Sequence, residues 1–400
     1  MPRRLFIPQT PASVSQVDAV QLVDGILAAA LARGASDVHI EPTADGAEVR
    51  FRVDGLLEVF SRHDHETGRC IVTRLMVMAQ LLTYRLDIPQ EGRLRIQSER
   101  ADAGNGDEAA AHSALRPLEL RLSIMPTTHG LRAAVRMPAE LIQPRSLEEL
   151  GLPEPVLWGL RQFAAAASGM LLVTGPAGAG KTTTIYALLD LIVRSRPGVS
   201  IVAIEDPVER DIPGVTQIEV SPFGQLTYER ALRSVVRQDP QVLMLGEIRD
   251  AATASLAAQA ALSGHRLICT MHAGTPGGAI ARLLEMGLEP YRITSTLFGV
   301  ISQRLLRKLN RDASGTASGG AIGHARHYRG RVPAAEFVPL SAALRRAILA
   351  GADAAELQRV AAAQPGHASL RHAAQILVAQ GLTDIDEVNR VLGPEDEAEQ

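Results

Sequence analysis

The feature that most constrains this chain is the stretch GPAGAGKT, residues 175–182, which fits the pattern G-x-x-x-x-G-K-[ST]. An apolar run, LLVT, precedes it, and a helical pattern, TTIYALL, follows it. Glycines in such a turn let successive backbone N–H groups face one point and hold phosphate oxygens there. The positive end of the following helix favours the same anion. The stretch therefore predicts a strand, a phosphate-binding loop and a helix, the central unit of an α/β fold.

The loop residues have distinct expected parts. The backbone N–H groups would hold the phosphates of ATP, and the Lys181 ammonium would reach its β- and γ-phosphates. The Thr182 hydroxyl would ligate Mg²⁺. The expected nucleotide-binding residues are Gly175, Pro176, Ala177, Gly178, Ala179, Gly180, Lys181, Thr182 and Thr183.

Carboxylates follow two other apolar runs of the second half. QVLML runs into Glu247, and SIVAI runs into Glu205. The carboxyl ends of strands in open α/β sheets face the ligand. We therefore expect Glu247 to hold Mg²⁺ through water and Glu205 to polarise the attacking water. For the neighbouring Asp206 the alternative is a turn or helix cap before Pro207.

Two histidines flank the apolar run RLICTM, residues 266–271. A lone histidine is usually structural, but two histidines at the ends of one strand, in a sheet with a phosphate loop, are stronger candidates for a functional role. His272 is the candidate for a γ-phosphate-sensing role, ahead of His265.

Alternating patterns predict two α/β domains. The second half alternates continuous apolar runs with helices, which is typical of a parallel sheet covered on both faces. The first half has an amphipathic helix followed by short alternating strands. The expected organisation is a tail at 1–15, an N-terminal α/β domain at 16–138, a proline-rich linker at 139–160, a phosphate-loop domain at 161–310, a flexible connector at 311–327 and a C-terminal helical region at 328–400. Residues 98–115 are small and polar and are expected to form a surface insertion, whose role the sequence does not reveal.

Composition excludes some classes of function. The net charge is −3 and aromatic residues make up 3%, so neither basic patches nor stacking platforms for nucleic acid are indicated. No stretch approaches the roughly 18 apolar residues that span a bilayer. Cys70 and Cys269 form no disulfide framework and no metal-type spacing.

Taken together, these motifs resemble the secretion-superfamily traffic ATPases, the assembly ATPases of type II secretion and type IV pili. The resemblance runs from about residue 35 to residue 307, and its motifs occur in the family's order. They are ASDVHIEP, FRVDG, IPQEGR, GPAGAGKTTT, IEDPVE, LRSVVRQDPQVLMLGEIRD and SGHRLICTMHAG. IEDPVE is similar to the family's aspartate box, GEIRD to its Walker B segment and GHRLICTMH to its histidine box.

The resemblance implies a RecA-like P-loop ATPase core with a smaller N-terminal PAS-like α/β domain. It also implies a homohexamer, cytoplasmic and peripheral at the inner membrane, in which ATP hydrolysis moves an inner-membrane platform protein that adds or extracts pilin subunits. Arg93 and Arg121 match positions that approach the phosphates as arginine fingers. We expect domain closure, in the same or a neighbouring subunit, to complete catalysis.

The chain departs from the family in several places. Residues 310–332 stand where many members carry a four-cysteine zinc module, and His324 with His327 cannot supply four ligands, so no structural zinc is expected. The chain begins where the family's second N-terminal domain begins, so the domain that docks onto a membrane partner is expected to be missing. LTYRLD replaces an acidic-arginine stretch, and AGTP replaces the pattern that usually follows the histidine box.

Several hypotheses about the function remain open. The first is an assembly motor for a pilus or pseudopilus, and the second is a retraction motor of the same architecture. The third is a conjugation or DNA-transfer ATPase, although no nucleic acid is expected as a partner. A degenerate nucleotide-binding regulator is disfavoured because Lys181, Glu205 and Glu247 are all present. Which secretion or pilus system is served, and which membrane partner, is not encoded in these motifs.

Overall fold

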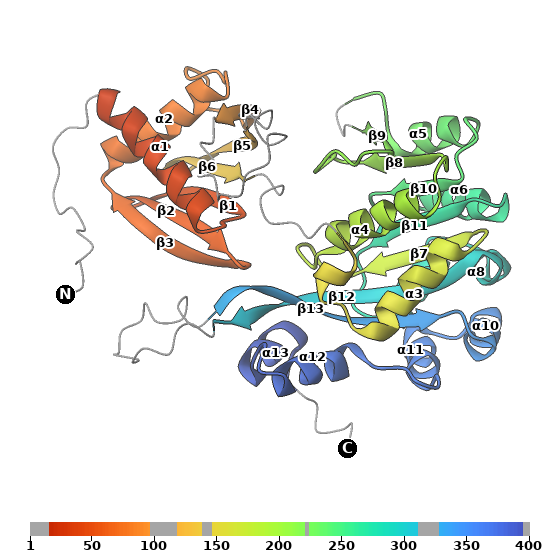
Figure 1. The fold of residues 1–400 in the computed structure, drawn as a ribbon. Helices are drawn as coiled ribbons and strands as arrows, with labels where there is room; N and C mark the ends of the chain where they lie inside the picture. Colours follow the sequence, from red (N-terminus) through yellow and green to blue (C-terminus); the bar gives the residue numbers. More distant parts are fainter. Residues whose placement is uncertain (1–15, 97–117, 138–145, 221–223, 311–327, 395–400) are drawn as a thin grey trace, which may run out of the picture. The chain divides into compact units, whose positions relative to one another are not determined.

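The computed structural model describes residues 16–96, 118–137, 146–220, 224–310 and 328–394 (Figure 1). The chain divides into two compact units, residues 1–142 and residues 143–400. The expected tail at 1–15, the insertion at 98–115 and the connector at 311–327 lie outside the described residues. None of the helices in the described ranges combines the length and apolarity needed to cross a bilayer.

The first unit is an antiparallel sheet with two helices. Its six strands are ordered β3-β2-β1-β6-β5-β4. The strands β4 and β5 pair antiparallel, with Arg93 opposite Arg121. The elements are α1 Gln16–Ala32, β1 Asp37–Thr43, β2 Gly46–Val53, β3 Leu56–His63, α2 His65–Met78, β4 Gln90–Ile96, β5 Leu118–Thr127 and β6 Gly130–Arg136.

One face of this sheet is buried and the other carries charge. Alternation along β5 buries Leu120, Leu122 and Ile124, which pack with apolar side chains of α1 and α2 in one core. Because successive strand residues point to opposite faces, Arg121 and Arg93 lie on the exposed face. The first unit therefore presents arginines on a sheet surface that its own helices do not cover.

The second unit contains a seven-stranded sheet ordered β13-β12-β7-β11-β10-β8-β9. Neighbouring strands from β12 to β9 run parallel, and β13 pairs antiparallel with β12 at the edge. The elements are η3 Glu148–Leu150, α3 Glu154–Ala165, β7 Gly169–Thr174, α4 Lys181–Ser195, β8 Ile201–Glu205, β9 Thr216–Glu219, α5 Tyr228–Val235, β10 Val242–Leu245, α6 Ala251–Leu262, β11 Arg266–Met271, α7 Pro276–Glu285, α8 Pro290–Thr296, β12 Leu297–Leu309, β13 Tyr328–Pro339, α10 Ala342–Leu349, α11 Ala354–Ala362, α12 Leu370–Ala379 and α13 Ile385–Leu392.

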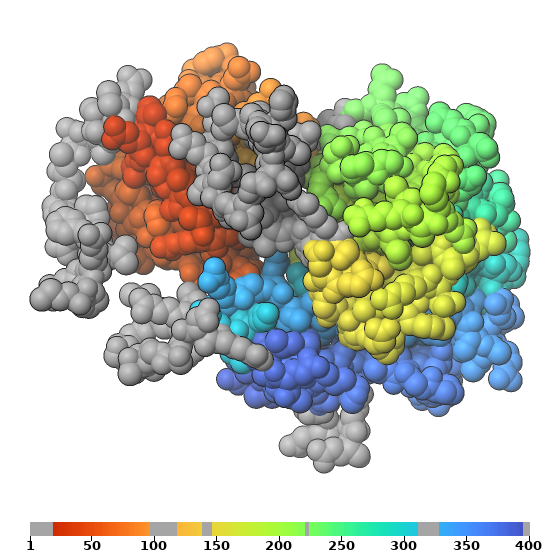
Figure 2. Space-filling model, viewed as in Figure 1, coloured from red at the N-terminus to blue at the C-terminus, as the bar shows by residue number. Residues whose placement is uncertain are grey.

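Helices cover both faces of this sheet, as the apolar runs predict. Alternate residues of β7 enter two separate cores: Leu171 and Val173 pack with α3 and α4, whereas Met170 and Leu172 pack with α6 to α8 and α10 to α11. Figure 2 shows α3 (yellow) and α4 (yellow-green) side by side on the surface of this unit. The expected strands at 170–174, 200–205, 241–245 and 266–271 are confirmed as β7, β8, β10 and β11.

The structure differs from the expected organisation in two places. In the expected linker 139–160, the described part belongs to the second unit, and Val156 and Leu160 of α3 lie in its core. Two of the prolines that suggest a linker instead begin a helix, with Pro153 as its N-cap and Pro155 in its first turn. In the expected helical region, residues 328–339 form β13, because they pair along β12 rather than with local neighbours.

Candidate functional site

The phosphate loop connects β7 to α4 at the carboxyl edge of the parallel sheet. Gly180 is the N-cap of α4 and has φ +84, a left-handed conformation that favours glycine. A Cβ at this position would lie 2.8 Å from Gln303 Nε2. Gly178, with φ +74, has no atom within 4 Å of an added Cβ, so the loop tip is open. The exposed residues Pro176, Ala177 and Gly178 form this tip.

The Lys181 ammonium lies over the loop. Its Nζ donates hydrogen bonds to Gly175 O at 2.8 Å and to Pro176 O at 2.9 Å. Burial lowers the pKa of Lys181, the Glu247 carboxylate opposes that shift, and the Arg304 guanidinium adds to it. The structure therefore brings the loop lysine within electrostatic reach of the carboxylate that follows β10.

Strand β12 supports the loop from beneath. Gln303 Nε2 donates to Ala179 O at 2.8 Å, and its Oε1 accepts from Thr184 Oγ1 at 2.8 Å. Thr174, at the end of β7, shares a 2.7 Å hydrogen bond with Ser302 Oγ. These groups are buried, so each satisfied hydrogen bond fixes the loop backbone against a rigid strand. Neither Ser302 nor Gln303 is predicted from the sequence.

Arg304 connects β12 to the segment after β11. Its NH1 donates to Gln303 O at 3.0 Å and its NH2 donates to Gly274 O at 3.1 Å. Burial lowers the pKa of Arg304, and Glu336 opposes the shift. Ser302, Gln303 and Arg304 directly follow the apolar run FGVI. A polar residue after an apolar run is the same signal that identifies Glu247 after β10, so this signal could have found them.

Glu247 lies in a cluster of charged side chains at this same edge. Its Oε1 lies 3.2 Å from His272 Nε2, and its Oε2 accepts from Arg249 Nε at 2.6 Å. Arg249 also lies 3.6 Å from Asp206. Glu247, His272 and Lys181 therefore gather around the loop. His265, at the amino end of β11, lies at the opposite edge of the sheet.

Glu205 ends β8 and is 3% exposed. One carboxylate oxygen accepts from Tyr186 Oη at 2.5 Å, and the other accepts from Gln217 Nε2 at 3.0 Å. Burial raises the pKa of Glu205, and these two hydrogen bonds act against that shift. The Tyr186 hydroxyl also accepts from Glu209 N at 3.2 Å, so one tyrosine of α4 holds both ends of the segment 205–209. Glu209, in contrast, is an exposed residue.

The donor set beside the loop fits Mg²⁺. Thr182 and Thr183 lie half-buried in the first turn of α4, and neither hydroxyl is hydrogen-bonded to another described residue. Hydroxyl and carboxylate oxygens are the ligands that Mg²⁺ prefers, usually one or two from the protein together with phosphate oxygens and water. No group of three or more His, Cys, Asp or Glu side chains in the described ranges could hold a metal alone. Thr182 and Glu247 therefore suit a metal shared with a phosphate ligand.

The two candidate finger arginines belong to the first unit. Arg93 donates to Glu119 Oε1 at 2.9 Å, and its side chain is about half exposed. Arg121 makes no side-chain hydrogen bond or ion pair with any other described residue. The register places Arg93, Arg121 and Arg136 in one row across β4, β5 and β6, on the exposed face.

Comparison with known proteins identifies relatives over most of the chain. The family model described as "Type II/IV secretion system protein" matches residues 13–390. The type II secretion system protein HxcR of Pseudomonas aeruginosa is 36% identical over 93% of this chain and 77% of its own length. The type II secretion system ATPase E of Vibrio cholerae is 34% identical over 93% and 75%. The type IV pilus assembly ATPase PilB of Thermus thermophilus is 32% identical over 95% of this chain but only 43% of its own.

Solved structures show the same fold. The crystal structure of the pilus retraction motor PilT with bound ADP has a TM-score of 0.61 and 27% identity, over 94% of this chain and 97% of PilT. The ATPase DotB of Yersinia pseudotuberculosis has a TM-score of 0.71 at 20% identity, over 94% and 93%, and supports the fold alone. From the family model and the secretion relatives together, this chain belongs to the type II/IV secretion system protein family.

Proposed function

We propose that this chain is an ATP-hydrolysing motor subunit that drives assembly of a type IV pilus or a type II secretion pseudopilus. The observation that carries the proposal is the cluster of Lys181, Glu247 and His272 around a glycine loop at the carboxyl edge of a parallel sheet. Relatives named as secretion and pilus assembly ATPases support it. In this proposal the second unit is a RecA-like core and the first unit a PAS-like domain.

The loop residues bind and orient the triphosphate. Residues 175–183 surround the phosphates with backbone N–H groups, and Lys181 exchanges its contacts with Gly175 O and Pro176 O for phosphate oxygens. Thr182 and Glu247 hold Mg²⁺, which supplies charge neutralisation on the phosphates when bound. His272, in contact with Glu247, reports whether the γ-phosphate is present.

The water-activating carboxylate is assigned to Glu205. Its raised pKa suits a group that takes up a proton, but both oxygens are held by Tyr186 and Gln217, so one contact must open. Glu205→Gln and Glu209→Gln test the assignment side by side. Loss of hydrolysis with retained ATP binding in Glu205→Gln alone supports it. The same loss in Glu209→Gln alone makes Glu205 a positioning residue.

Arg93 and Arg121 act as arginine fingers in this proposal. A finger contributes about 10³–10⁵ in rate. Arg121 has no partner among the described residues that would have to be displaced, whereas Arg93 must leave Glu119. Closure of the first unit, in the same or a neighbouring subunit, then converts hydrolysis into domain motion.

The assembly that fits this chemistry is a homohexamer, cytoplasmic and peripheral at the inner membrane, acting on an inner-membrane platform protein. Nucleic acid is not a partner in this proposal. A retraction motor of the same architecture is the second candidate, because PilT, a retraction motor, shares the fold at 27% identity.

Two experiments test the function. Purified Lys181→Ala should lose ATP binding and hydrolysis, while Lys308→Ala, an exposed lysine on β12, should keep both. Unchanged ATP binding by Lys181→Ala would remove the proposal. In the source cells, Lys181→Ala should leave the surface without fibres if the motor assembles them. An excess of fibres would identify a retraction motor instead.

A further inference from the structure

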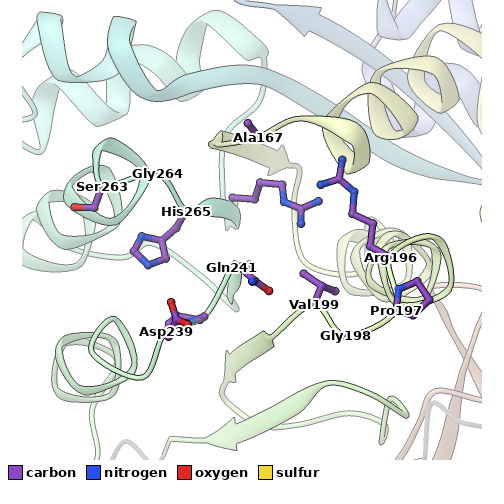
Figure 3. Close-up of a pocket in the computed structure, with 12 residues that line it drawn as sticks. Ala167, Arg196, Pro197, Gly198, Val199, Asp239, Gln241, Ser263, Gly264 and His265 are labelled. Carbon is purple, nitrogen blue, oxygen red and sulfur yellow. The ribbon is translucent and has the colours of Figure 1, made fainter.

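A pocket of about 510 Å³ opens at the other edge of the second unit's sheet (Figure 3). Its lining comes from four short segments, residue 167 and residues 196–199, 239–241 and 263–266. These segments lead into β7, β8, β10 and β11, so the pocket lies at the amino ends of the parallel strands. The phosphate loop lies at the carboxyl ends, roughly 20 Å away along the six residues of β7. The pocket is therefore separate from the proposed nucleotide site.

A buried arginine contributes to the lining of this pocket. Arg266 is 3% exposed, and its NH1 donates to Ala164 O at 2.7 Å. That is its one side-chain hydrogen bond to a described residue, and it forms no ion pair with any of them. A guanidinium has five N–H donors, and none of the other nitrogens of Arg266 is both buried and without a hydrogen-bond partner, so they are open to solvent at the cavity. Arg266 therefore has donors and charge that these contacts do not satisfy.

A second arginine stands beside the first. Arg196 donates through NH2 to Ala165 O at 2.6 Å and likewise lacks a carboxylate partner in the described ranges. Burial lowers the pKa of Arg266, and repulsion from Arg196 lowers it further. Asp239, the one carboxylate in the lining, makes no ion pair with either arginine within 4.0 Å. Two adjacent cations therefore face this cavity without a carboxylate partner among the described residues.

Capping of α3 accounts for part of this arrangement. Ala164 and Ala165 end α3, and arginines commonly bind the last carbonyls of a helix. A cap uses one N–H group of each side chain. It leaves the other N–H groups of both guanidiniums without a partner among the described residues. The remaining donors point to an anionic ligand.

We propose that this pocket binds the phosphate group of a small soluble molecule, with Arg196 and Arg266 as its ligands. The planar fork of a guanidinium matches phosphate oxygens, and the cavity volume lies within the range of small-molecule sites. Gln241, Ser263 and His265 complete a polar lining that suits hydroxyl groups better than acyl chains. The inference does not depend on the proposed function.

The test titrates inorganic phosphate by calorimetry into the full chain carrying Lys181→Ala, which removes phosphate binding at the loop. We expect one saturable site. Adding Arg196→Gln or Arg266→Gln should weaken it about tenfold or more, because each removes charge-assisted hydrogen bonds. The matched control is Arg194→Gln, an exposed arginine of α4 paired with Asp190, which should leave phosphate binding unchanged.

The outcomes separate the alternatives. Absence of saturable phosphate binding, or equal binding by the Arg196 and Arg194 variants, overturns the proposal. Vesicles with and without phosphatidylglycerol form a second arm, and an Arg196-dependent response to vesicles but not to phosphate also overturns it. If Arg266→Gln does not fold, the exposed Arg196 keeps the test decisive.

Discussion

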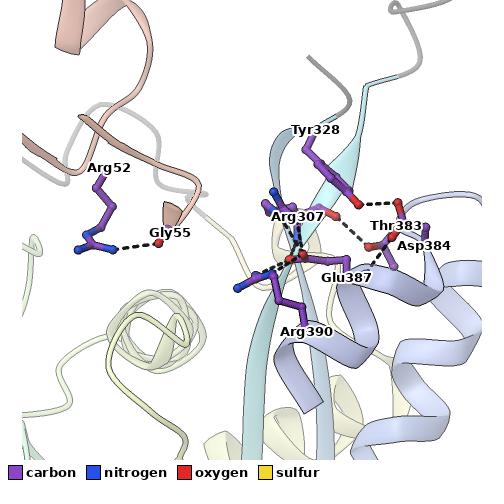
Figure 4. Close-up of polar contacts among 8 residues, drawn as sticks. All are labelled: Arg52, Gly55, Arg307, Tyr328, Thr383, Asp384, Glu387 and Arg390. Carbon is purple, nitrogen blue, oxygen red and sulfur yellow. Dashed lines mark hydrogen bonds and ion pairs between the residues drawn. The ribbon is translucent and has the colours of Figure 1, made fainter. Parts of the chain in front are cut away.

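Replacing Glu387 by glutamine should loosen the C-terminal helices from the β12–β13 hairpin. Glu387, in α13, is 1% exposed, and its carboxylate accepts hydrogen bonds from the side chains of Arg307 and Arg390 (Figure 4). It also accepts from Arg307 N at 2.9 Å. The Arg307 guanidinium lies 4.0 Å from the Tyr328 ring centroid, and the Tyr328 hydroxyl donates to Asp384. The Glu387 carboxylate therefore connects α13 to β12.

The magnitude follows from the pKa of this group. Burial alone would raise the pKa of Glu387, but hydrogen bonds from Arg390 and Arg307 outweigh it and lower the pKa from 4.5 to about 2. At 1.36 kcal/mol per unit, that difference stabilises the folded state by about 3 kcal/mol at neutral pH. Removing one partner of a buried pair costs a similar amount, about 3–5 kcal/mol. Since the folded pKa is depressed, this stability is present above pH 4.5 and is lost as the pH falls toward 2.

Hydrogen exchange of the full chain measures this effect locally. An opening made easier by about 3 kcal/mol should speed exchange in α13 roughly 100-fold in Glu387→Gln at neutral pH. The control is Glu356→Gln in α11, whose carboxylate also binds an arginine three residues later but is exposed. It should leave exchange near the parental rate. Equal exchange in α13 of the two variants would refute the argument that burial makes this pair strong.

Three further predictions concern the nucleotide site. Tyr186→Phe should lower the unfolding free energy by about 1–3 kcal/mol in denaturant titrations, because Glu205 loses a buried hydrogen-bond donor. Tyr291→Phe, which removes an exposed hydroxyl, should leave the unfolding free energy unchanged. Equal losses in the two variants would contradict the stabilising role of the Tyr186 hydroxyl. Gln303→Ala should weaken ATP binding about tenfold in equilibrium titration, because the loop loses contacts at Ala179 O and Thr184; parental affinity would show that the loop holds its own shape. Arg93→Ala and Arg121→Ala should keep ATP binding but lose most steady-state hydrolysis in the assembled state. Arg95→Ala, on the same exposed face, should keep its hydrolysis. Parental hydrolysis rates in both Arg93→Ala and Arg121→Ala would exclude the finger assignment.

The parts of the fold that local signals encode could be predicted from the sequence. The phosphate loop and the parallel strands β7, β8, β10 and β11 each follow from runs of fewer than about 15 residues. The edge strand β13 could not be predicted in this way. Its residues YRGRVPAAEFVP contain two prolines and a glycine, and they form a strand because β12 offers a partner along its length. Such pairing depends on contacts distant in sequence, which propensity does not capture.

The candidate site divides along the same line. Lys181, Thr182, Glu247 and His272 follow strand ends and are brought to one edge, because strand direction alone determines where those ends lie. Glu205 obeys the same rule, yet its carboxylate turns toward Tyr186 and Gln217. Direction along a strand predicts which edge a residue reaches but not which neighbour its side chain meets. That choice depends on α4 and β9, which lie elsewhere in the sequence.

The contacts of strand β12 could not be predicted from motifs. Leu297–Ser302 pair with β7 on one side, and from Gly299 onward the strand also pairs with β13. Directly after this doubly paired part, Gln303 contacts the phosphate loop and Arg304 contacts the segment after β11. Five residues after Ser302, where β7 no longer pairs, Arg307 binds α13. The strand therefore joins the loop to the C-terminal helices through one part paired with both β7 and β13 and a second part paired with β13 alone. Because Gln303 directly follows the doubly paired part, loosening Glu387 should change exchange in α13 far more than ATP affinity.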